Sequence, residues 1–480
     1  MPLLKVAHAA RLSLVLLATA STVTISACAG FPSEQAARVA TPPDAYASAQ
    51  TLAGPQADWP ADEWWKGYGD AQLNTLMAEA LAGSPTIAIA EARLRAADAV
   101  ADQARGAAQP NVTANASARE QKQSYNDGIP PAFVPQGYNP AGHLALNFSW
   151  ELDFWGRNRA AIAAATSEAQ AVAAEGAEAR LMLSTNVAAT YAELSRLYAQ
   201  RDVAERTLAA QQETAALVRR RVEAGLDTRG EQAAADAGPL SAKVALSSLD
   251  EQIALTRNAL AALLGQGPDR GLAIQRPPTT SLKPFGLPAN LAADLVGRRP
   301  DIVAARWRAQ ASASRVKGAK AAFYPNINLA ALVGVEALPI GKLFSSGSDI
   351  GQFGPAISLP IFEGGQLRAG LKGAQARRDE AVAVYDAQVI QALREVADVV
   401  ASERALAPRL ADARAALGAD EEAYRIARLR YEGKLANYQS VLQAEQVVLA
   451  QRRATADLES RGLALDIALI RALGGGFHSG

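Results

Sequence analysis

The residue types that most often do chemistry are few and widely spaced in this chain of 480 residues. The histidines are His8 near the N-terminus, His143 beside an expected strand and His478 in the C-terminal tail. Zinc sites and Ser-His-Asp triads need several side chains close together in space. Histidines at these three positions cannot form either kind of site within one chain. Lys plus Arg and Asp plus Glu number 48 each, and this neutrality argues against nucleic acid as a partner. The sequence therefore predicts neither an enzyme nor a metal or cofactor site.

Cys28, the single cysteine, ends a segment that is typical of export. Lys5 and Arg11 flank the start of an apolar run over residues 12–27, which is the pattern of a secretory signal. The Ile-Ser-Ala-Cys ending resembles the lipobox of bacterial lipoproteins, in which the cysteine is acylated, and several acyl chains anchor a protein stably. Ala29 in place of Asp resembles the pattern that sorts such proteins to the outer membrane. The alternative is an ordinary signal peptide with an incidental cysteine.

The rest of the chain is an internal duplication. Residues 85–112 match residues 300–327 at a spacing of 215, and residues 149–226 match residues 358–435 at a spacing of 209. A stretch rich in Gly and Pro, 265–288, is interpreted as the linker between the copies. The predicted boundaries are a signal peptide at 1–27, a lipid-anchored segment at 28–69, a first repeat at 70–280, a second repeat at 281–474 and a tail at 475–480.

Each copy has the same order of elements. A helix of roughly 25 residues leads to Pro110 or Pro325, where the pattern changes. Two strands follow, separated by an exposed loop that is rich in Gly, Pro, Asn or Ser. Apolar side chains alternate with small ones, which suits a strand with one face toward lipid. The predicted strands are 112–124, 144–154, 326–336 and 353–362.

Gly156 and the pair Gly364-Gly365 stand at the junction between the second strand and a long helix. The pair lacks the lysine and the spacing of a phosphate-binding loop, so we interpret it as structural. About 65 to 70 residues follow each junction, enough for a helix of about 100 Å. Apolar residues three and four apart indicate a coiled-coil seam. They are Leu183, Val187, Leu194 and Leu197 in the first copy, and Tyr385, Val389, Ala392, Val396, Val399, Leu406, Leu410, Ala413 and Leu417 in the second. Return helices are predicted at 231–264 and 440–473.

These features resemble the outer-membrane efflux proteins of the TolC/OprM family, and most of all their NodT-like outer-membrane lipoproteins. The resemblance extends from about Asp62 to Leu473, and the order of the motifs together with the duplication makes it specific. The matching stretches are WW at 64–65, GDAQL at 69–73, SWELDFWG at 149–156, RRPDI at 298–302, FYP at 323–325 and LPIFEGG at 359–365.

The resemblance implies a mainly α-helical chain with a transmembrane β part, in a TolC-like duplicated fold. The long coiled-coil hairpins would form a helical barrel in the periplasm, and four strands per chain would join a trimeric barrel of about 12 strands in the outer membrane. Four strands alone would leave open edges in lipid, which agrees with a homotrimer. The implied partners are outer-membrane lipid, a periplasmic adaptor protein and an inner-membrane pump, for which the RND type is expected.

The resemblance also implies a gate at the helix turns farthest from the membrane. In the family a tyrosine at the second turn contacts an acidic residue at the first, and the matching positions here are Tyr431 and Glu231. The alternative is that both are solvated turn residues. Relatives carry aspartates where this chain has Ser440 and Gln443, so an acidic ring at the mouth would need Glu445 or Glu231.

The two turns differ between the copies. Tyr431 corresponds to Val222, and Lys434 replaces the glycine that the first copy has at Gly225. We expect Gly433 to adopt the positive φ in place of Lys434. The symmetry between the copies is therefore expected to break at this mouth.

The function that follows is passive conduction of drugs, toxic compounds or metal ions to the exterior, with energy supplied by the pump. Two alternatives stay open: a type I secretion outlet for polypeptides, and a periplasmic scaffold lipoprotein that does not conduct. The sequence leaves the cargo undefined, because the pump selects it. The expected location is the outer membrane, lipid-anchored and extending into the periplasm.

Overall fold

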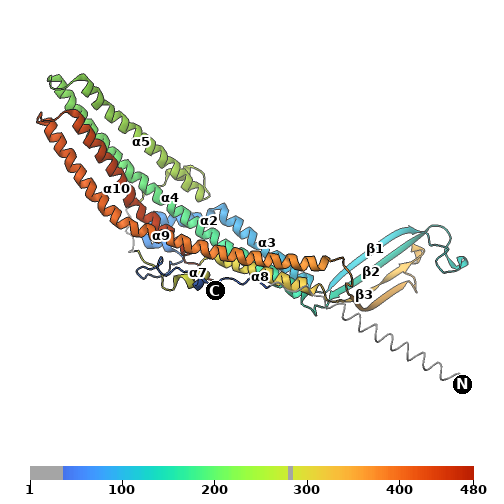
Figure 1. Cartoon of the computed structure of the whole chain (residues 1–480). Helices are drawn as coiled ribbons and strands as arrows, with labels where there is room; N and C mark the ends of the chain where they lie inside the picture. The colour runs from blue at the N-terminus through green and yellow to red at the C-terminus, as the bar shows by residue number, and fades with distance from the viewer. Residues whose placement is uncertain (1–35, 279–284, 480) are drawn as a thin grey trace. The chain divides into compact units, whose positions relative to one another are not determined.

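The computed structural model describes residues 36–278 and 285–479, so Cys28 and the signal segment lie outside the described residues. The described chain is mainly helical with one four-stranded sheet (Figure 1). Within those two ranges, no helix is long and apolar enough to cross a membrane. The helices are α2 (Ala71–Gly83), α3 (Pro85–Ala107), α4 (Arg157–Glu223), α5 (Arg229–Leu263), α6 (Asp269–Leu272), α7 (Leu291–Arg298), α8 (Pro300–Ala321), α9 (Gln366–Glu432) and α10 (Tyr438–Ala472). The strands are β1 (Asn111–Gln121), β2 (Asn139–Glu151), β3 (Asn326–Ala337) and β4 (Asp349–Ser358).

The described chain forms two compact units, and each takes segments from both predicted repeats. The first unit comprises residues 36–40, 96–170 and 306–384, and the second comprises the described residues of 41–95, 171–305 and 385–480. The units therefore do not coincide with the repeats, whose boundaries stay a prediction.

The first unit contains the sheet, which is antiparallel in the order β1-β2-β3-β4. Each repeat contributes one hairpin, and pairing of β2 with β3 joins the two hairpins. β2 begins and ends earlier than the predicted 144–154, and β4 begins and ends earlier than the predicted 353–362. Residues 139–142 were expected in a loop because of their Gly, Pro and Asn content, yet they pair with the end of β1. Backbone pairing, not side-chain pattern, sets these strand ends.

The register sorts the sheet into two chemically different faces. Opposite residues of paired strands share a face, and residues two apart along a strand share it as well. One face is apolar and crosses all four strands through Val112, Phe148, Ala331 and Phe353 in one row and Ala114, Leu146, Val333 and Gly351 in the next. The other face is largely polar or small, with Thr113, Asn147, Asn115, Ala145, His143 and Glu336 among its residues.

Glycines with positive φ stand directly before both long helices. Gly156 (φ 77°) precedes α4, and Gly364 (φ 56°) and Gly365 (φ 89°) precede α9. Residues other than glycine rarely adopt a positive φ, because their side chain clashes with the backbone. Asp153 completes the first junction, where its carboxylate accepts the backbone N–H of Asn158 at 3.0 Å and caps the start of α4.

Two of the motifs meet within the first unit. The ring of Trp155 stacks on that of Tyr324 with centroids 4.6 Å apart. The indole Nε1 of Trp155 donates to the carbonyl oxygen of Pro325 at 2.8 Å. The SWELDFWG stretch of the first repeat is thus joined to the FYP turn of the second.

The long helices are confirmed and are equal in length between the repeats. α4 and α9 have 67 residues each, and α5 and α10 have 35 each. Pro408 lies inside α9 and Pro239 inside α5, and neither ends its helix. Corresponding ends are 209 residues apart at every helix boundary of the two hairpins. The repeat therefore holds at the level of single residues.

Most of the predicted seam residues are buried in two apolar clusters of the second unit, whereas Leu406, Leu410, Ala413 and Leu417 of α9 are half-buried. The first cluster contains Leu183, Val187, Leu194 and Leu197 of α4, together with Leu76 and Met77 of α2. The second contains Tyr385, Val389, Ala392, Val396 and Val399 of α9, together with Leu295 and Ile302. Fully burying a side chain of this size contributes about 1.5 to 3 kcal/mol, so these clusters cover the long helices against solvent.

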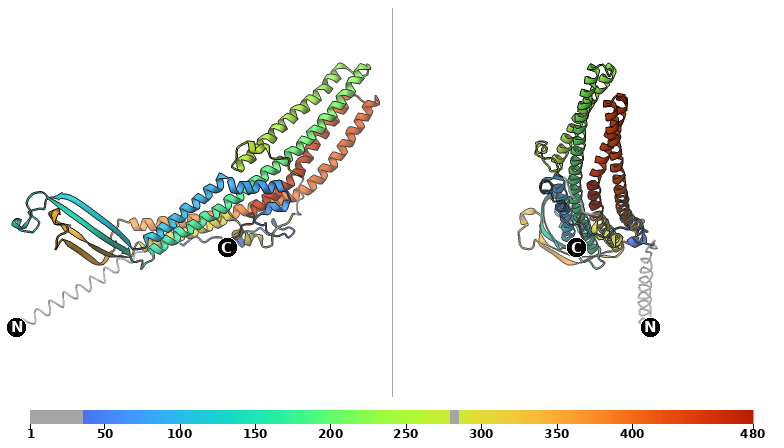
Figure 2. Two further views of the ribbon diagram at one scale, coloured as in Figure 1. Left: turned by 180° about the vertical axis from the view of Figure 1, so that it is seen from behind. Right: turned by 90° about the vertical axis from the view of Figure 1, so that its left-hand side faces the viewer.

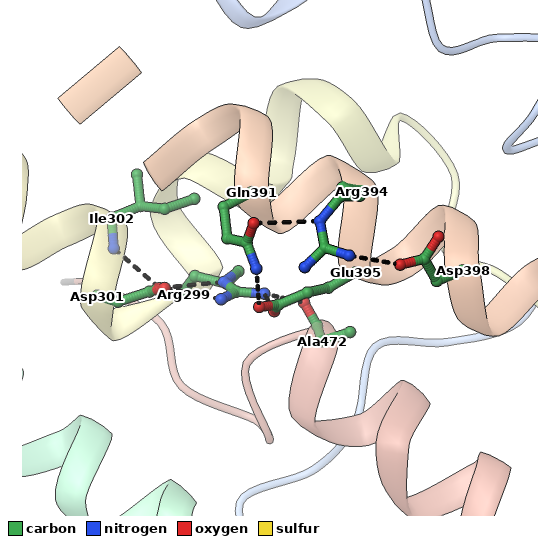
Figure 3. A network of polar contacts seen from close by, with 8 residues as sticks. All are labelled: Arg299, Asp301, Ile302, Gln391, Arg394, Glu395, Asp398 and Ala472. Carbon is green, nitrogen blue, oxygen red and sulfur yellow. Dashed lines mark hydrogen bonds and ion pairs between the residues drawn. The ribbon is translucent and has the colours of Figure 1, made fainter. Parts of the chain in front are cut away.

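Arg299 of the RRPDI motif connects three helices inside the second unit (Figure 3). Its buried guanidinium lies 2.7 Å from the carboxylates of Asp301, on α8, and of Glu395, on α9. It also donates to the carbonyl of Ala472, at the end of α10, at 3.1 Å. Burial alone would lower the pKa of Arg299, but the two carboxylates outweigh it and raise the pKa. The charge therefore persists and also meets the negative end of the α10 dipole.

Removing this cation should destabilise the second unit. Arg299→Met leaves Asp301 and Glu395 without their partner, and breaking a buried pair costs about 3 to 5 kcal/mol. We expect that loss in the free energy of unfolding, measured by denaturation in detergent with circular dichroism. The control is Arg394→Met, whose exposed ion pair with Asp398 is worth at most about 1 kcal/mol. Equal losses in the two variants would contradict the role of Arg299.

Candidate functional site at the helix turns

The candidate site lies where each long helix turns back. The turns are residues 224–228 in the first repeat and 433–437 in the second, and both belong to the second unit. Both views of Figure 2 show these turns at the same end of α4, α5, α9 and α10. The equal helix lengths bring the first turn beside the end of α9.

Tyr431 binds across the repeats to the first turn. Its hydroxyl donates to a carboxylate oxygen of Asp227. Arg221, at the end of α4, donates from Nε to the same carboxylate at 2.9 Å. The guanidinium also lies over the Tyr431 ring, 4.2 Å from its centroid, in a cation–π contact. These three side chains form one connected group, which we call the Tyr431 lock.

The lock is ionised and buried at neutral pH. The Asp227 side chain is 6% exposed. Burial alone would raise the pKa of Asp227, but hydrogen bonds from Arg221 and Tyr431 outweigh it and hold the pKa below its usual value of 3.8. Burial and the Asp227 carboxylate raise the pKa of Tyr431, so its hydroxyl stays a donor. A lowered carboxyl pKa means that the lock is fully formed above pH 3.8 and is lost as the pH falls through the lowered value.

The predicted contact between Tyr431 and Glu231 is wrong, because Glu231 is engaged in capping α5. Thr228 Oγ1 accepts the backbone N–H of Glu231 at 3.2 Å, and Glu231 Oε2 accepts the backbone N–H of Thr228 at 2.7 Å. This is a capping box, whose signature is Ser or Thr followed three residues later by Glu. The Thr-Arg-Gly-Glu run at 228–231 carries that signature. Recognising it would have assigned Glu231 to the cap and left Asp227 as the acid for Tyr431.

An apolar cluster surrounds the lock and contains residues from both repeats. Tyr431, Tyr438 and Val441 come from the second repeat, and the smaller Ala215, Val218 and Ala235 come from the first. The rings of Tyr431 and Tyr438 are 5.9 Å apart. At the positions corresponding to these two tyrosines the first repeat has Val222 and Arg229. The aromatic side of the contact is therefore supplied by one repeat alone.

Comparison with known proteins shows two matched segments, one in each repeat. Residues 76–266 and 291–475 match the outer membrane efflux protein family. The chain belongs to this family. It is 31% identical over 473 residues to the multidrug resistance outer membrane protein MdtP of Escherichia coli, covering 96% of both chains. It is also 40% identical over 369 residues to the fusaric acid resistance protein FusA of Burkholderia cepacia, covering 76% of this chain and 69% of that one.

Solved structures of outer-membrane proteins have the same fold. The outer membrane protein VceC of Vibrio cholerae is 46% identical, with a TM-score of 0.82 over 88% of this chain and 100% of that chain. The outer-membrane channel OprN is 29% identical, with a TM-score of 0.79 over 93% and 97%. The chain is thus an outer-membrane efflux channel that extends into the periplasm, and it is not an enzyme. Within the described ranges, no group of three or more His, Cys, Asp or Glu side chains is placed to hold a metal ion.

This efflux protein places its predicted mouth residues on the first two turns of α10. Ser440 and Gln443 are both exposed, and the N–H of Ser440 donates to the capping side chain of Asn437 at 3.2 Å. Glu445, one candidate for an acidic ring, is instead 4% exposed. Glu231, the other candidate, caps α5. Of the two candidates for an acidic ring, Glu445 is therefore withdrawn from the surface, whereas Glu231 stays partly exposed at the first turn.

The second turn of this efflux protein takes its positive φ at a lysine. Lys434 has φ 63°, and the corresponding Gly225 has φ 72°. The expectation that Gly433 would adopt the left-handed backbone is wrong, because the turn geometry repeats at a spacing of 209 residues whatever side chain is present. A non-glycine residue in this region costs roughly 1 kcal/mol, so the second turn is the more strained of the two.

The different roles of Glu231 and Asp227 can be separated by amide hydrogen exchange. Glu231→Ala removes half of the capping box, which costs about 1 kcal/mol and should speed exchange about fivefold in the first turn of α5. The end of α9 should be unaffected. Asp227→Ala should show the reverse, with faster exchange around Tyr431 and an unchanged α5. If Glu231→Ala released the end of α9 instead, the assignment of Asp227 as the partner would fail.

Proposed function

We propose that three copies of this chain form one passive duct, which carries small molecules from an inner-membrane pump and a periplasmic adaptor through the outer membrane. The observation that carries the proposal is a four-stranded sheet that ends in two edge strands, β1 and β4. Unpaired backbone groups are very unfavourable in lipid. Pairing β4 of one copy with β1 of the next closes a sheet of about 12 strands from three chains.

The two faces of the sheet support this arrangement. Its apolar face presents side chains that are exposed in the single chain, including Phe353 at 93%. Such a face suits contact with lipid, and the polar and small residues of the opposite face suit a wet interior. The apolar face matches the proposed lipid boundary without any further partner.

The helix turns supply a surface for the adaptor. Leu226 and Leu435 occupy corresponding positions in the two turns and are 45% and 73% exposed. Exposed large apolar residues at matched positions suit protein contact. We propose that the adaptor docks on these leucines and that the pump behind it is of the RND type.

We propose that the Tyr431 lock is the gate of this duct. It holds the end of the second long helix against the turn of the first repeat through a hydrogen bond to a charged group. Such a bond is worth about 1.5 to 3 kcal/mol, an amount that a docking adaptor can replace with contacts of its own. The gate therefore needs no energy source within the duct.

Removing the Tyr431 hydroxyl should open the duct. Tyr431→Phe keeps the ring but loses the bond to Asp227, which should raise the open population about tenfold or more. The measurement is the conductance of the full-length protein in a planar lipid bilayer at mildly acidic pH, which is still above the lowered pKa of Asp227. Tyr438→Phe is the matched control. It removes the same group from a neighbouring tyrosine, whose ring centroid is 5.9 Å from that of Tyr431, and leaves the bond to Asp227 in place.

Two results would count against this gate. A Tyr431→Phe protein that inserts but conducts no more than the wild type would remove the lock from the mechanism. A Tyr438→Phe protein that opens equally would show that any loosening of the cluster suffices, independent of Asp227.

We also propose that Cys28 carries covalent lipid that anchors the mature chain in the outer membrane. The supporting observations are the apolar run that precedes it and its status as the single cysteine of the chain. Labelling cells with radioactive palmitate should mark the wild type and leave Cys28→Ser unlabelled. Label retained by Cys28→Ser would contradict the anchor.

The cargo we propose is small organic toxicants rather than polypeptides. The support is the relatives, which are named for multidrug resistance and for fusaric acid resistance. In a passive duct the pump decides what enters. The neutral mouth residues Ser440 and Gln443 fit a duct that makes little selection by charge.

A further inference from the structure

The duplication provides an internal comparison for the residues behind the turns. The helix boundaries of the two hairpins are 209 residues apart throughout. Arg219 therefore corresponds to Arg428, and Asp236 corresponds to Glu445. Each repeat carries an arginine on its long helix and an acid on its return helix, at matched positions.

In the first repeat these two side chains form an ion pair. Nη2 of Arg219 lies 3.0 Å from Oδ1 of Asp236, and both side chains are substantially exposed. A pair at this exposure contributes little to stability. It does show that the hairpin geometry allows the arginine and the acid to meet at the surface.

In the second repeat the corresponding pair is not made. Arg428 donates from Nε to Glu432 at 3.0 Å and lies 3.6 Å from Glu213 on α4. Glu445 is 4% exposed, and its Oε1 has no hydrogen-bond partner among the described residues. The same two positions thus hold an arginine that pairs with other acids and a buried acid with one oxygen that has no hydrogen-bond partner among the described residues.

Glu445 lies on the same face of α10 as the residues that surround the lock. Tyr438 and Val441 are seven and four residues before it, and both belong to the cluster around Tyr431. Tyr438 on α10 and Tyr424 on α9 are the titratable groups that interact with Glu445. Behind them, Tyr424 also interacts with Arg428 on α9 and with Arg452 on α10, and Arg428 in turn pairs with Glu432 on α9 and lies near Glu213 on α4. Arg452 is engaged with Glu421 at 2.7 Å, and Arg428 is the cation whose counterpart binds the acid in the first repeat.

We propose that Glu445 is a proton-controlled positioning residue for the Tyr431 lock. Protonated, it stays in the apolar cluster and holds the second hairpin closed. Ionised, it leaves the cluster and pairs with Arg428, as Asp236 pairs with Arg219, and the lock is released. This inference rests on the gate proposed above and adds that pH controls whether the gate is closed or open.

The sign of the effect follows from burial. Burial raises the pKa of Glu445 from 4.5 to about 7, because an isolated charge is disfavoured in an apolar cluster. The closed packing is therefore most stable below pH 4.5 and loses stability as the pH rises through about 7. With an ordinary pKa in the released state, the open-to-closed ratio per chain should rise about tenfold between about pH 6 and about pH 8. The Asp227 carboxylate cannot produce this profile, because its pKa is lowered.

The test is the conductance of the full-length protein in planar bilayers as a function of pH. The wild type should open as the pH rises through about 7. Glu445→Gln copies the neutral form at nearly the same size and should stay closed across the range. Arg428→Gln removes the partner of the ionised acid and should move the opening to higher pH. Wild-type pH dependence retained in Glu445→Gln would overturn the proposal.

The first repeat supplies matched controls. Asp236→Asn and Arg219→Gln make the same changes at the corresponding, exposed pair, and both should keep the wild-type pH profile. A flattened profile in Asp236→Asn as well would assign the effect to surface charge in general and would overturn the special role of Glu445.

A second measurement separates this inference from the proposed function. Tyr431→Phe should conduct at every pH, and its silence would refute the Tyr431 lock as the gate, whatever the state of Glu445. Spin labels at Leu226→Cys and Leu435→Cys, in a Cys28→Ser background, report the distance between the two turns without conductance. That distance should change with a midpoint near pH 7 and should be constant in Glu445→Gln; a distance that is independent of pH with Glu445 present would overturn the inference.

Discussion

The structure depends on one constraint, which is that a helix of 67 residues has no core of its own and must be covered along its length by other helices. The duplication meets this constraint by supplying a second helix of the same length and two return helices of equal length. Equal lengths bring both turns to the same end of the four helices. Tyr431 of one repeat then reaches Asp227 of the other, so the candidate gate is a consequence of matched helix lengths.

The parts of the fold that could be predicted are those that correspond to long, regular patterns in the sequence. The spacing of 209 residues and the apolar seam through Val187 and Val396 extend over many turns, and both were confirmed. Strand ends leave no such pattern, because pairing with a neighbour decides where a strand begins. Residues 139–142 contain the Gly and Pro of a loop and still pair with β1. Lys434 shows the same limit, since the turn imposes its backbone on whichever residue stands there.

The sequence predicted the correct tyrosine of the candidate site but the wrong carboxylate as its partner. Asp227 and Glu231 are four residues apart on either side of the N-cap of α5, and the start of α5 decides which of them is free to bind across the repeats. Thr228 fixes that start by capping with Glu231, and this local bond leaves Asp227 to face Tyr431. Glu445 was weighed as a mouth residue, yet its spacing from Tyr438, Val441 and Val448 on α10 places it on the buried face. Cys28 lies outside the described residues, so the sequence alone supports its assignment.

The contrast between the two hairpins shows why a duplicated chain can carry a switch in one copy only. Apolar packing can be made by different residues in the two copies. In the cluster around the lock, the first hairpin contributes Ala215 and Val218, and the second contributes tyrosines. A carboxyl group is different, because its free energy depends on its surroundings and on pH together. Asp236 meets its arginine at the surface, so the first hairpin needs no buried acid and nothing in this pair favours one conformation. Within the cluster, Glu445 is stable only while it is neutral, so its proton occupancy and the closure of the second hairpin form a single equilibrium. Breaking the symmetry at this one pair is therefore enough to make one hairpin of the duct responsive while the other stays fixed.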